Sequence, residues 1–337
     1  MNCSKSFITY APSHADLKDS QKMSTYRRKL ITPRLATYGL VALLTIFLSF
    51  PAVYAQQSQD DDDDDVVRVN TDLVVVNVTV TDGVGKYARG LRRPDFKLFE
   101  DGREQKISSF GAEETPFAAA VLLDFSGSME KRVSMARAAA IRFLDGLREE
   151  DVAAVYKFDS EIEQLQDYSP SRDLAPLAFG MRAKGMTVLN DAVLRAAEDL
   201  SRRPEKRRAI IVLSDGYDTK SSASVEKALA TAFNAGVTIY TVDMSSPETS
   251  SVQARAQAAG TLRNFANKSG GRYISTPGGQ AMREAFNSIL EELGNQYTLA
   301  YQPSNRARDG RFREIEVKLS RAELTARTRK GYRAPKN

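Results

Sequence analysis

The sequence predicts an α/β fold with a doubly wound, mostly parallel sheet and flanking helices, joined to a small all-β, sandwich-like unit. Continuous apolar runs such as Phe117–Asp124 and Ala209–Leu213 are typical of strands that are buried on both faces of a parallel sheet. Amphipathic segments such as Lys131–Leu147 alternate with these runs, and alternating strands and helices of this length build a doubly wound sheet. Period-two, β-branched patterning on both sides of this region predicts the all-β unit.

The α/β domain is expected to span residues 116–295. Besides the two apolar strands and the helix just described, its elements are predicted from the period of their apolar residues and from turn residues such as Gly236. In chain order these are a strand at Val152–Phe158, helices at Val188–Leu200 and Val225–Asn234, a strand at Val237–Val242, a helix at Gln253–Lys268, a short strand at Arg272–Ser275 and a last helix around Met282–Leu293.

Two β segments flank that domain, at residues 66–112 and 296–337. The first contains the alternating run Val74–Thr81 and a hairpin signal at Asp101-Gly102, directly after Asp95–Glu100. The second contains the expected strands Tyr297–Tyr301, Arg313–Leu319 and Leu324–Thr328. Neither segment is long enough to bury a good core alone. We therefore predict that the two pair into one β-sandwich, with the α/β domain inserted between them.

The N-terminal region has the features of an export signal. Arg27, Arg28, Lys29 and Arg34 precede the uncharged run Leu35–Phe50, and Val53-Tyr54-Ala55 fits a signal-peptidase site. Residues 1–55 are therefore expected to be a signal peptide that is cut after Ala55, with Met23 as an alternative start. An uncleaved membrane anchor is the other interpretation. Residues 56–65 form an acidic linker, and the protein is expected to be periplasmic, cell-surface or extracellular.

Composition excludes several classes of function. Residues 1–55 carry seven Lys or Arg and two Asp, a net charge of +5 that equals the +5 of the whole chain. The remainder is neutral overall, which argues against nucleic acid as a partner. Cys3 and His14 are the chain's only cysteine and histidine. A chain that starts near Gln56 therefore has no disulfide, no Cys/His zinc site and no His-based catalytic triad.

The strongest motif is Asp124-Phe125-Ser126-Gly127-Ser128, directly after the first buried strand. The strand Ala209–Leu213 ends in Ser214-Asp215-Gly216, and Thr187 stands at the start of a predicted helix. Because ligands of open parallel sheets gather beyond the carboxyl ends of the strands, these oxygen-bearing side chains are expected at one edge. Carboxylates and hydroxyls form a shell that suits a hard cation, Mg²⁺ first, with Mn²⁺ or Ca²⁺ as alternatives. Turn and N-cap chemistry at each motif is the alternative interpretation.

These residues resemble the von Willebrand factor A (VWA) family and its metal-ion-dependent adhesion site. The family pattern is D-x-S-x-S, a later Thr and an Asp after the central strand, and it matches Asp124, Ser126, Ser128, Thr187 and Asp215. The resemblance implies that the hydroxyls coordinate the cation directly while the aspartates commonly act through water. Flanking phrases such as Glu100-Asp101-Gly102 and Gly331-Tyr332-Arg333 are similar to secreted bacterial VWFA-related proteins.

The expected function is an exported, metal-dependent protein-binding or adhesion module. The resemblance implies a protein ligand that presents an Asp or Glu to the cation. The protein is not expected to be an enzyme, because no general base is placed by any motif. A structural envelope scaffold with a stabilising metal and a metal-dependent hydrolase are the alternatives. A membrane is expected as a partner only if the N-terminal segment stays uncleaved.

Overall fold

The computed structural model describes residues 73–112, 115–174, 185–245, 251–276 and 279–336. The chain divides into two units, Met1–Val66 and Val67–Asn337, and all described residues belong to the second. The expected signal peptide and the acidic linker lie outside the described residues.

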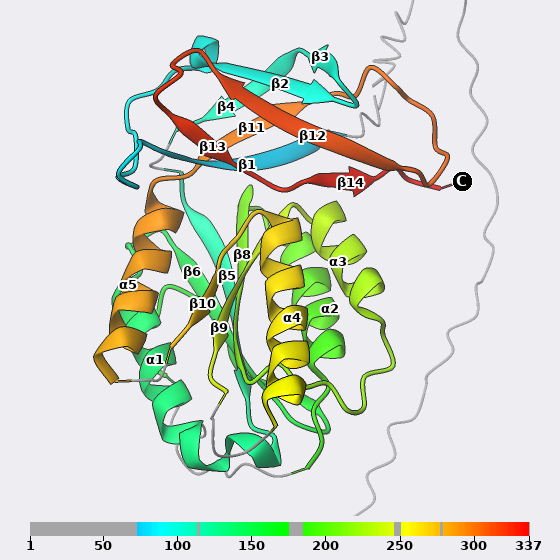
Figure 1. Cartoon of the computed structure of the whole chain (residues 1–337). Coiled ribbons are helices and arrows are strands. Elements are labelled where there is room, and N and C mark those ends of the chain that lie inside the picture. The colour runs from blue at the N-terminus through cyan, green and yellow to red at the C-terminus, as the bar shows by residue number, and fades with distance from the viewer. Residues whose placement is uncertain (1–72, 113–114, 175–184, 246–250, 277–278, 337) are drawn as a thin grey trace, which may run out of the picture. The chain divides into compact units, whose positions relative to one another are not determined.

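A six-stranded sheet forms the centre of the α/β domain, in the order β10-β9-β8-β5-β6-β7 (Figure 1). Its first five strands are parallel, and β7 pairs antiparallel with β6 at one edge. The apolar composition of β5 and β8 suits their central position, because strands covered on both faces bury every side chain. The strands are β5 Phe117–Asp124, β6 Val152–Phe158, β7 Ile162–Ser169, β8 Arg207–Ser214, β9 Val237–Asp243 and β10 Tyr273–Ser275.

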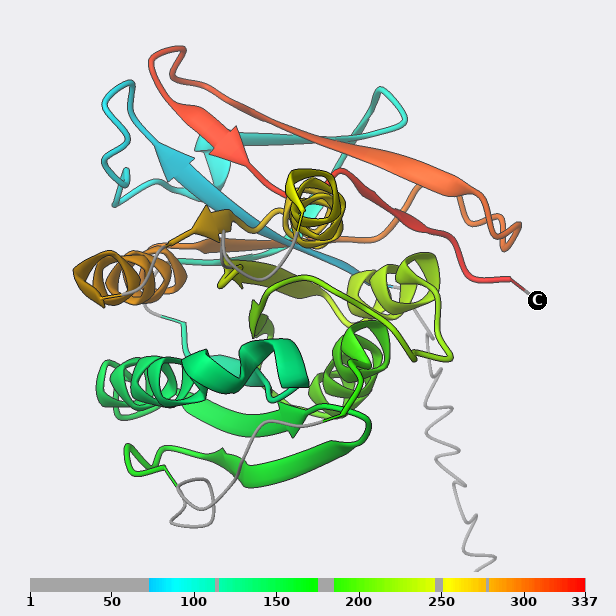
Figure 2. The same cartoon turned by 60° about the horizontal axis from the view of Figure 1, so that its bottom comes forward.

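Helices cover both faces of this sheet (Figures 1 and 2). Helices α2, α3 and α4 pack on one face, against residues such as Ala120 and Val212, and α1 and α5 pack on the other, against residues such as Val121 and Ile211. Successive residues of each strand point to opposite faces, so one strand supplies both cores. The helices are α1 Val133–Asp145, α2 Leu189–Ser201, α3 Val225–Asn234, α4 Val252–Ser269 and α5 Gly279–Gly294, with the 3₁₀ helix η2 Gly127–Arg132 before α1.

Two four-stranded antiparallel sheets stand at one end of the α/β domain (Figure 1). Their orders are β13-β1-β11-β4 and β14-β12-β2-β3, so strands that precede the α/β domain pair with strands that follow it. The bounds are β1 Val74–Thr81, β2 Phe96–Glu100, β3 Arg103–Gln105, β4 Ile107–Gly111, β11 Tyr297–Tyr301, β12 Phe312–Leu319, β13 Thr325–Arg327 and β14 Gly331–Arg333, with the 3₁₀ helix η1 at Arg93–Asp95.

Strand β1 is buried on both faces, which explains its polar residues. Val76 and Val78 are fully buried in the core that Leu98 and Ile315 of the second sheet also join. Asn77 and Thr79 lie on the other face, where Asn77 donates a hydrogen bond of 3.4 Å to the carbonyl of Gly236 in the α/β domain. A buried polar side chain needs a hydrogen-bond partner. The polar residues of β1 therefore suit the face that packs against the α/β domain.

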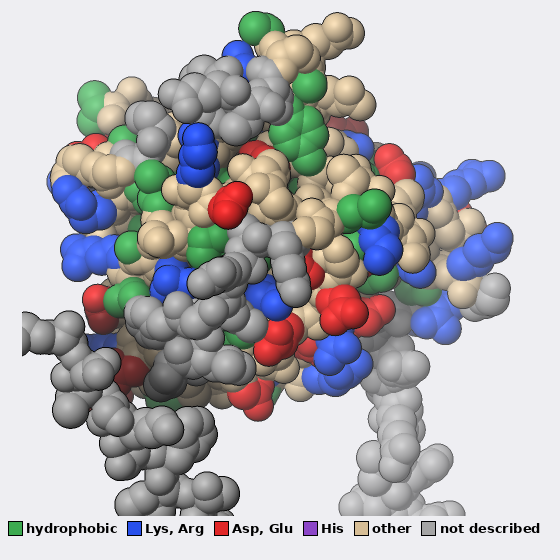
Figure 3. All heavy atoms as spheres, turned by 90° about the horizontal axis from the view of Figure 1, so that it is seen from below, with side chains coloured by type: hydrophobic (Ala, Val, Ile, Leu, Met, Phe, Trp, Pro, Cys, Tyr) green, Lys and Arg blue, Asp and Glu red, His purple; other side chains and the backbone are tan. Residues whose placement is uncertain are grey.

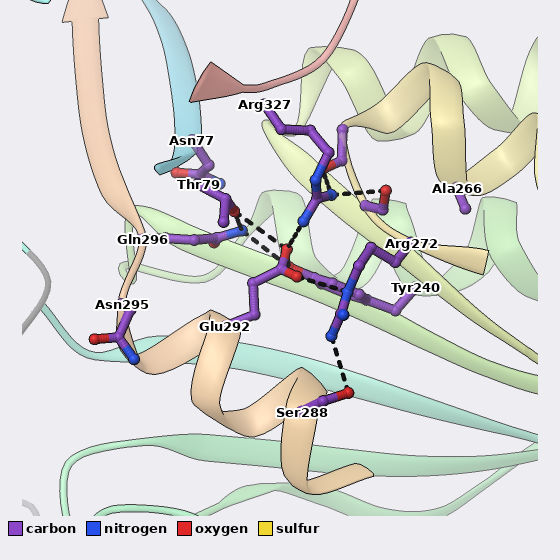
Figure 4. A network of polar contacts seen from close by, with 12 residues as sticks. Asn77, Thr79, Tyr240, Ala266, Arg272, Ser288, Glu292, Asn295, Gln296 and Arg327 are labelled. Atoms are coloured by element: carbon purple, nitrogen blue, oxygen red, sulfur yellow. Dashed lines mark hydrogen bonds and ion pairs between the residues drawn. The ribbon is translucent and has the colours of Figure 1, made fainter. Parts of the chain in front are cut away.

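Glu292 of α5 is the centre of a buried polar network between the two parts (Figure 4). Its carboxylate accepts hydrogen bonds from Tyr240 Oη at 2.8 Å and from Thr79 Oγ1 at 3.1 Å. Arg272 forms an ion pair with it at 2.8 Å, and Arg327 of β13 forms a second. A buried carboxylate is tolerated only when it is paired and hydrogen-bonded, as here. The network therefore holds α5, β9, β1 and β13 in one arrangement.

The fold class is confirmed, with differences in detail. The segment expected to be one helix at Lys131–Leu147 begins as the 3₁₀ helix η2 and becomes α-helical only from Val133 to Asp145. The edge strand β7, Ile162–Ser169, was not expected. It has only one neighbour and keeps most of its side chains partly exposed, so its sequence lacks the apolar run by which a central strand is recognised.

Candidate metal site

The two central strands bring their ends together at one edge of the sheet. Strands β5 and β8 pair in register up to Leu123 and Leu213, so Asp124 lies beside Ser214. The hydroxyl of Ser214 donates a hydrogen bond of 2.5 Å to Oδ2 of Asp124. Both residues have no exposed surface. Parallel pairing thus delivers the first and the last predicted carboxylates, Asp124 and Asp215, to the same place.

The loop after β5 arranges three oxygen-bearing side chains. Oδ1 of Asp124 accepts a hydrogen bond of 2.9 Å from the backbone N–H of Ser126, which closes a tight turn. The hydroxyls of Ser126 and Ser128 lie 3.1 Å apart and share a hydrogen bond. Ser128 also interacts with the carboxylate of Asp215 and lowers the pKa of that carboxyl. Four of the five predicted residues therefore form one continuous cluster.

Thr187 reaches the same edge through backbone contacts. The N–H of Gly127 donates to the carbonyl of Gly185 at 3.3 Å, which joins the Thr187 loop to the loop after β5. The N–H of Thr187 donates to Oγ1 of Thr219 at 2.9 Å, and its carbonyl accepts from Thr219 and Lys220. Thr187 is buried. Its hydrogen bonds in the described structure run to the 219–220 loop, whereas the other four residues contact one another directly.

Two further aspartates support these loops. Asp218 accepts hydrogen bonds from the N–H groups of Asn190 at 2.8 Å and Ser221 at 3.0 Å. Asp191 accepts from the N–H groups of residues 222 and 223, both at 2.8 Å. Each carboxylate thus binds the 216–224 loop to the start of α2. This is a positioning role, as expected for carboxylates that are not themselves ligands.

Burial disfavours the ionised forms of Asp124 and Asp215. Burial, and then the charge of Asp215, raise the pKa of the Asp124 carboxyl to about 7. The pKa of Asp215 is raised as well, by its own burial and by Asp243, while Ser128, the Tyr217 N–H and Arg132 act in the opposite direction. Each raised pKa means that the ionised form is disfavoured. A nearby positive charge would favour that form.

The donor set fits a hard divalent cation. Two buried carboxylates and two hydroxyls converge in one hydrogen-bonded cluster, and oxygen ligands of this kind suit Mg²⁺ or Ca²⁺. Within the described ranges, no group of three His, Cys, Asp or Glu forms a metal centre. A site here would therefore depend on the serine hydroxyls as well as on the aspartates.

Ser214 is a member of the site that sequence reasoning missed. Its hydroxyl orients Asp124 and also accepts the N–H of Gly216 at 2.9 Å. Gly216 has φ of +84°, and a Cβ there would lie 2.5 Å from the carbonyl oxygen of Ala258. The Ser-Asp-Gly motif therefore needs all three of its residues, the first to hold Asp124 and the third for a turn that only glycine permits.

A third carboxylate, Asp243, ends β9 at this edge of the sheet. It accepts a hydrogen bond of 2.5 Å from Tyr273 Oη and one of 2.8 Å from the N–H of Ser245.

Seen from below, the described surface at this end of the domain carries acidic and basic side chains interspersed (Figure 3). Within the described segments, no helix combines the length and the apolar character needed to cross a membrane.

Comparison with known proteins identifies the domain. Residues 105–267 match a family model described as "VWA domain containing CoxE-like protein". The chain is 29% identical over 131 residues to inter-alpha-trypsin inhibitor heavy chain H3 of Rattus norvegicus and 28% identical to that of Homo sapiens. Each match covers 35% of this chain and 15% of the relative, so the chain corresponds to a small part of those proteins.

Solved structures with similarity to the chain include a membrane protein and a pilus adhesin. An aerotolerance-related membrane protein from Bacteroides fragilis matches with 15% identity and a TM-score of 0.42, over 52% of this chain and 98% of that one. The pilus adhesin SpaC from Lactobacillus rhamnosus GG matches with 11% identity and a TM-score of 0.45, over 75% of this chain and 49% of that one.

Proposed function

Because this chain is a VWA domain protein, we propose that it is an exported protein-binding module that engages an acidic residue of its partner through a divalent cation. Asp124, Ser126, Ser128, Thr187 and Asp215 would hold the cation, Mg²⁺ first, with Mn²⁺ or Ca²⁺ as alternatives. The observation that carries the proposal is the buried cluster in which both carboxylates have a raised pKa, Ser214 donates a hydrogen bond to Asp124 and Ser128 interacts with Asp215. Such a cluster gains stability from a cation.

Some residues of the site would supply charge to the cation, and others hold the ligands in position. Asp124 and Asp215 supply negative charge, and Ser214 together with the Ser126 N–H holds Asp124 in place. Ser126 and Ser128 supply neutral oxygens in a fixed pair. When bound, the cation would act as a Lewis acid. Because few of its ligands are anionic, enough of its positive charge would remain to attract a carboxylate of another protein. Ser128 is exposed, so the cluster opens toward solvent on its side.

Capture of partners with the immobilised protein tests this proposal. Envelope extract of the source organism is passed over wild-type protein in Mg²⁺ and in excess EDTA, and over an Asp124→Ala variant in Mg²⁺. The matched control is Glu149→Ala, which removes one exposed carboxylate away from the site. We expect a partner that is retained by wild type and by Glu149→Ala in Mg²⁺, and lost in EDTA and with Asp124→Ala. Equal retention in EDTA would contradict the proposal.

The same proteins separate the two alternative functions. A structural scaffold predicts that Asp124→Ala lowers the melting temperature while every captured partner is retained. A metal-dependent hydrolase predicts turnover of phosphoester, ester or peptide substrates that disappears with Asp124→Ala. Either result would replace the binding proposal, because the binding proposal expects loss of the partner without loss of the fold.

A further inference from the structure

A cavity of about 580 Å³ lies where the sandwich meets the end of α3. It is lined by β14, by the segment at residues 302–308 and by the carboxyl end of α3; Figure 1 shows β14 beside that helix. Val75, Phe233 and Pro303 contribute apolar wall. The volume falls in the range of roughly 300–1,000 Å³ that is usual for small-molecule sites. The cavity shares no lining residue with the Asp124 cluster.

Positive charge dominates this cavity. The described residues that line it include seven Lys or Arg and no Asp or Glu. Residues 306–337 carry eleven Lys or Arg against four Asp or Glu, and five of those eleven face the cavity. Lys206, Arg306, Arg308 and Arg333 are exposed at the rim, whereas Arg208, Arg313 and Arg329 lie deeper.

Two of the deeper arginines have structural partners. Arg208 donates from Nη1 to the carbonyl of Ala235 at 2.8 Å, where it caps the end of α3. Arg313 forms an ion pair of 3.4 Å with the buried carboxylate of Glu100. These two side chains are explained by the fold, and they carry no argument for a ligand.

Arg329 has a carbonyl partner and an aromatic neighbour, but no carboxylate partner among the described residues. It is 6% exposed, and its Nη1 donates to the carbonyl of Phe233 at 2.5 Å. The Tyr332 ring lies 5.7 Å from its guanidinium carbon. Its Nε is buried without a hydrogen-bond partner, and among the described residues no Asp or Glu forms an ion pair with it. Burial lowers its pKa to about 10. A buried cation without a counter-charge is costly, and an anion would offset that cost.

We propose that this cavity binds a small multivalent anion of the phosphate or polycarboxylate class, with Arg329 as its buried anchor and the exposed cations as its rim. Guanidinium groups bind both kinds of anion through charge-assisted hydrogen bonds. The apolar wall can contact the organic part of a ligand that carries the anionic groups. This site is independent of the proposed cation site, because it needs no metal and uses none of the same residues.

Calorimetric titration with inorganic tripolyphosphate and with citrate tests the proposal. The purified protein is stripped of metal with a chelating resin, so that neither probe acts through a bound cation. The rim variant is Lys206→Gln, Arg306→Gln and Arg333→Gln. The matched control is Lys97→Gln, Lys106→Gln and Arg321→Gln, which also removes three exposed positive charges but lies outside the cavity. Tighter binding of tripolyphosphate assigns the phosphate class, and tighter binding of citrate the polycarboxylate class.

We expect saturable binding by wild type that the rim variant weakens at least about tenfold, since each exposed pair contributes a few-fold. The control triple variant and Asp124→Ala should bind like wild type, and Arg329→Gln should abolish binding. Should Arg329→Gln fail to fold, the rim variant decides the question. No saturable binding of either probe, or equal weakening in the control variant, would overturn the proposal. If Asp124→Ala still binds the probes, anion binding does not depend on the proposed cation site. A failure of one proposal can then be told apart from a failure of the other.

Discussion

The hydroxyl of Ser214 donates a 2.5 Å hydrogen bond to Oδ2 of Asp124, across the boundary between β8 and β5. Asp124 has no exposed surface, so its orientation depends on the few groups that touch it. One of these is the Ser126 N–H, which binds the other carboxylate oxygen. The first predicted ligand is thus held from both sides before any cation arrives, which is the type of preorganisation that tunes metal affinity.

Replacing Ser214 with Ala is expected to weaken Mg²⁺ affinity by about tenfold or more, because loss of such a supporting hydrogen bond commonly costs 10–100-fold in metal sites. Calorimetric titration of Mg²⁺ measures the change. Ser201→Ala is the control, since Ser201 is an exposed serine at the end of α2. Unchanged affinity in Ser214→Ala would show that Asp124 does not need this support.

Replacing Glu292 with Ala is expected to destabilise the protein by about 2–3 kcal/mol, because Arg272 and Arg327 lose their shared partner and the buried Tyr240 hydroxyl loses its acceptor. The neighbouring Glu291 is exposed, and Glu291→Ala should change the free energy of unfolding by only about 0.5 kcal/mol. Urea unfolding of both variants measures the difference. Similar small losses in the two would mean that the network in Figure 4 contributes little to stability.

Alkaline pH is expected to destabilise the sandwich through its buried tyrosines. Burial and the hydrogen bond to Glu100 raise the pKa of Tyr332 to about 12, and the pKa of Tyr301 is raised by the same causes. A phenol of the unfolded chain ionises near pH 10. The contribution of Tyr332 is therefore fully present below about pH 10 and is lost as the pH rises through about 12.

Urea unfolding between about pH 9 and pH 11.5 checks this expectation, with Tyr332→Phe beside wild type. The variant loses the hydrogen bond of 2.9 Å to Glu100, so its absolute stability falls. Its decline with pH should nevertheless be shallower, because one titrating phenol is gone. Parallel declines in the two proteins would contradict the assignment to Tyr332.

The predicted signal peptide lies outside the described residues and is tested separately. If residues 1–55 are a cleaved signal peptide, intact-mass measurement of the protein isolated from cells should find a chain that begins at Gln56. A mass that corresponds to a start at Met1 or Met23 would show instead that the apolar run Leu35–Phe50 is retained.

Much of the fold could be predicted because burial on both faces leaves a clear pattern. Strand β5 was expected from its uninterrupted apolar run, and the helix α3 at Val225–Asn234 from its apolar residues and from Gly236 just after its end. Strand β7 could not be, because an exposed edge strand has no such pattern. Likewise, η2 differs from α1 only in backbone hydrogen bonding, which side-chain periodicity does not reveal.

Some features of the candidate site could likewise be predicted from the sequence, and others could not. Asp124 and Asp215 were expected together because parallel strands end at one edge, and the structure links them through Ser128. The role of Ser214 was not expected, because it depends on the register of β5 against β8. The placement of Thr187 depends on Thr219, which holds its loop from a distant part of the chain. No local sequence pattern encodes such a contact.

Direct titration of Mg²⁺ into the metal-free protein tests the central claim, that the five oxygen-bearing residues hold one divalent cation. We predict one ion per chain for wild type and Glu149→Ala, with affinity reduced at least about 100-fold in Asp124→Ala while circular dichroism shows the fold retained. Equal Mg²⁺ affinity in Asp124→Ala and wild type, or no binding by wild type at millimolar Mg²⁺, would contradict it.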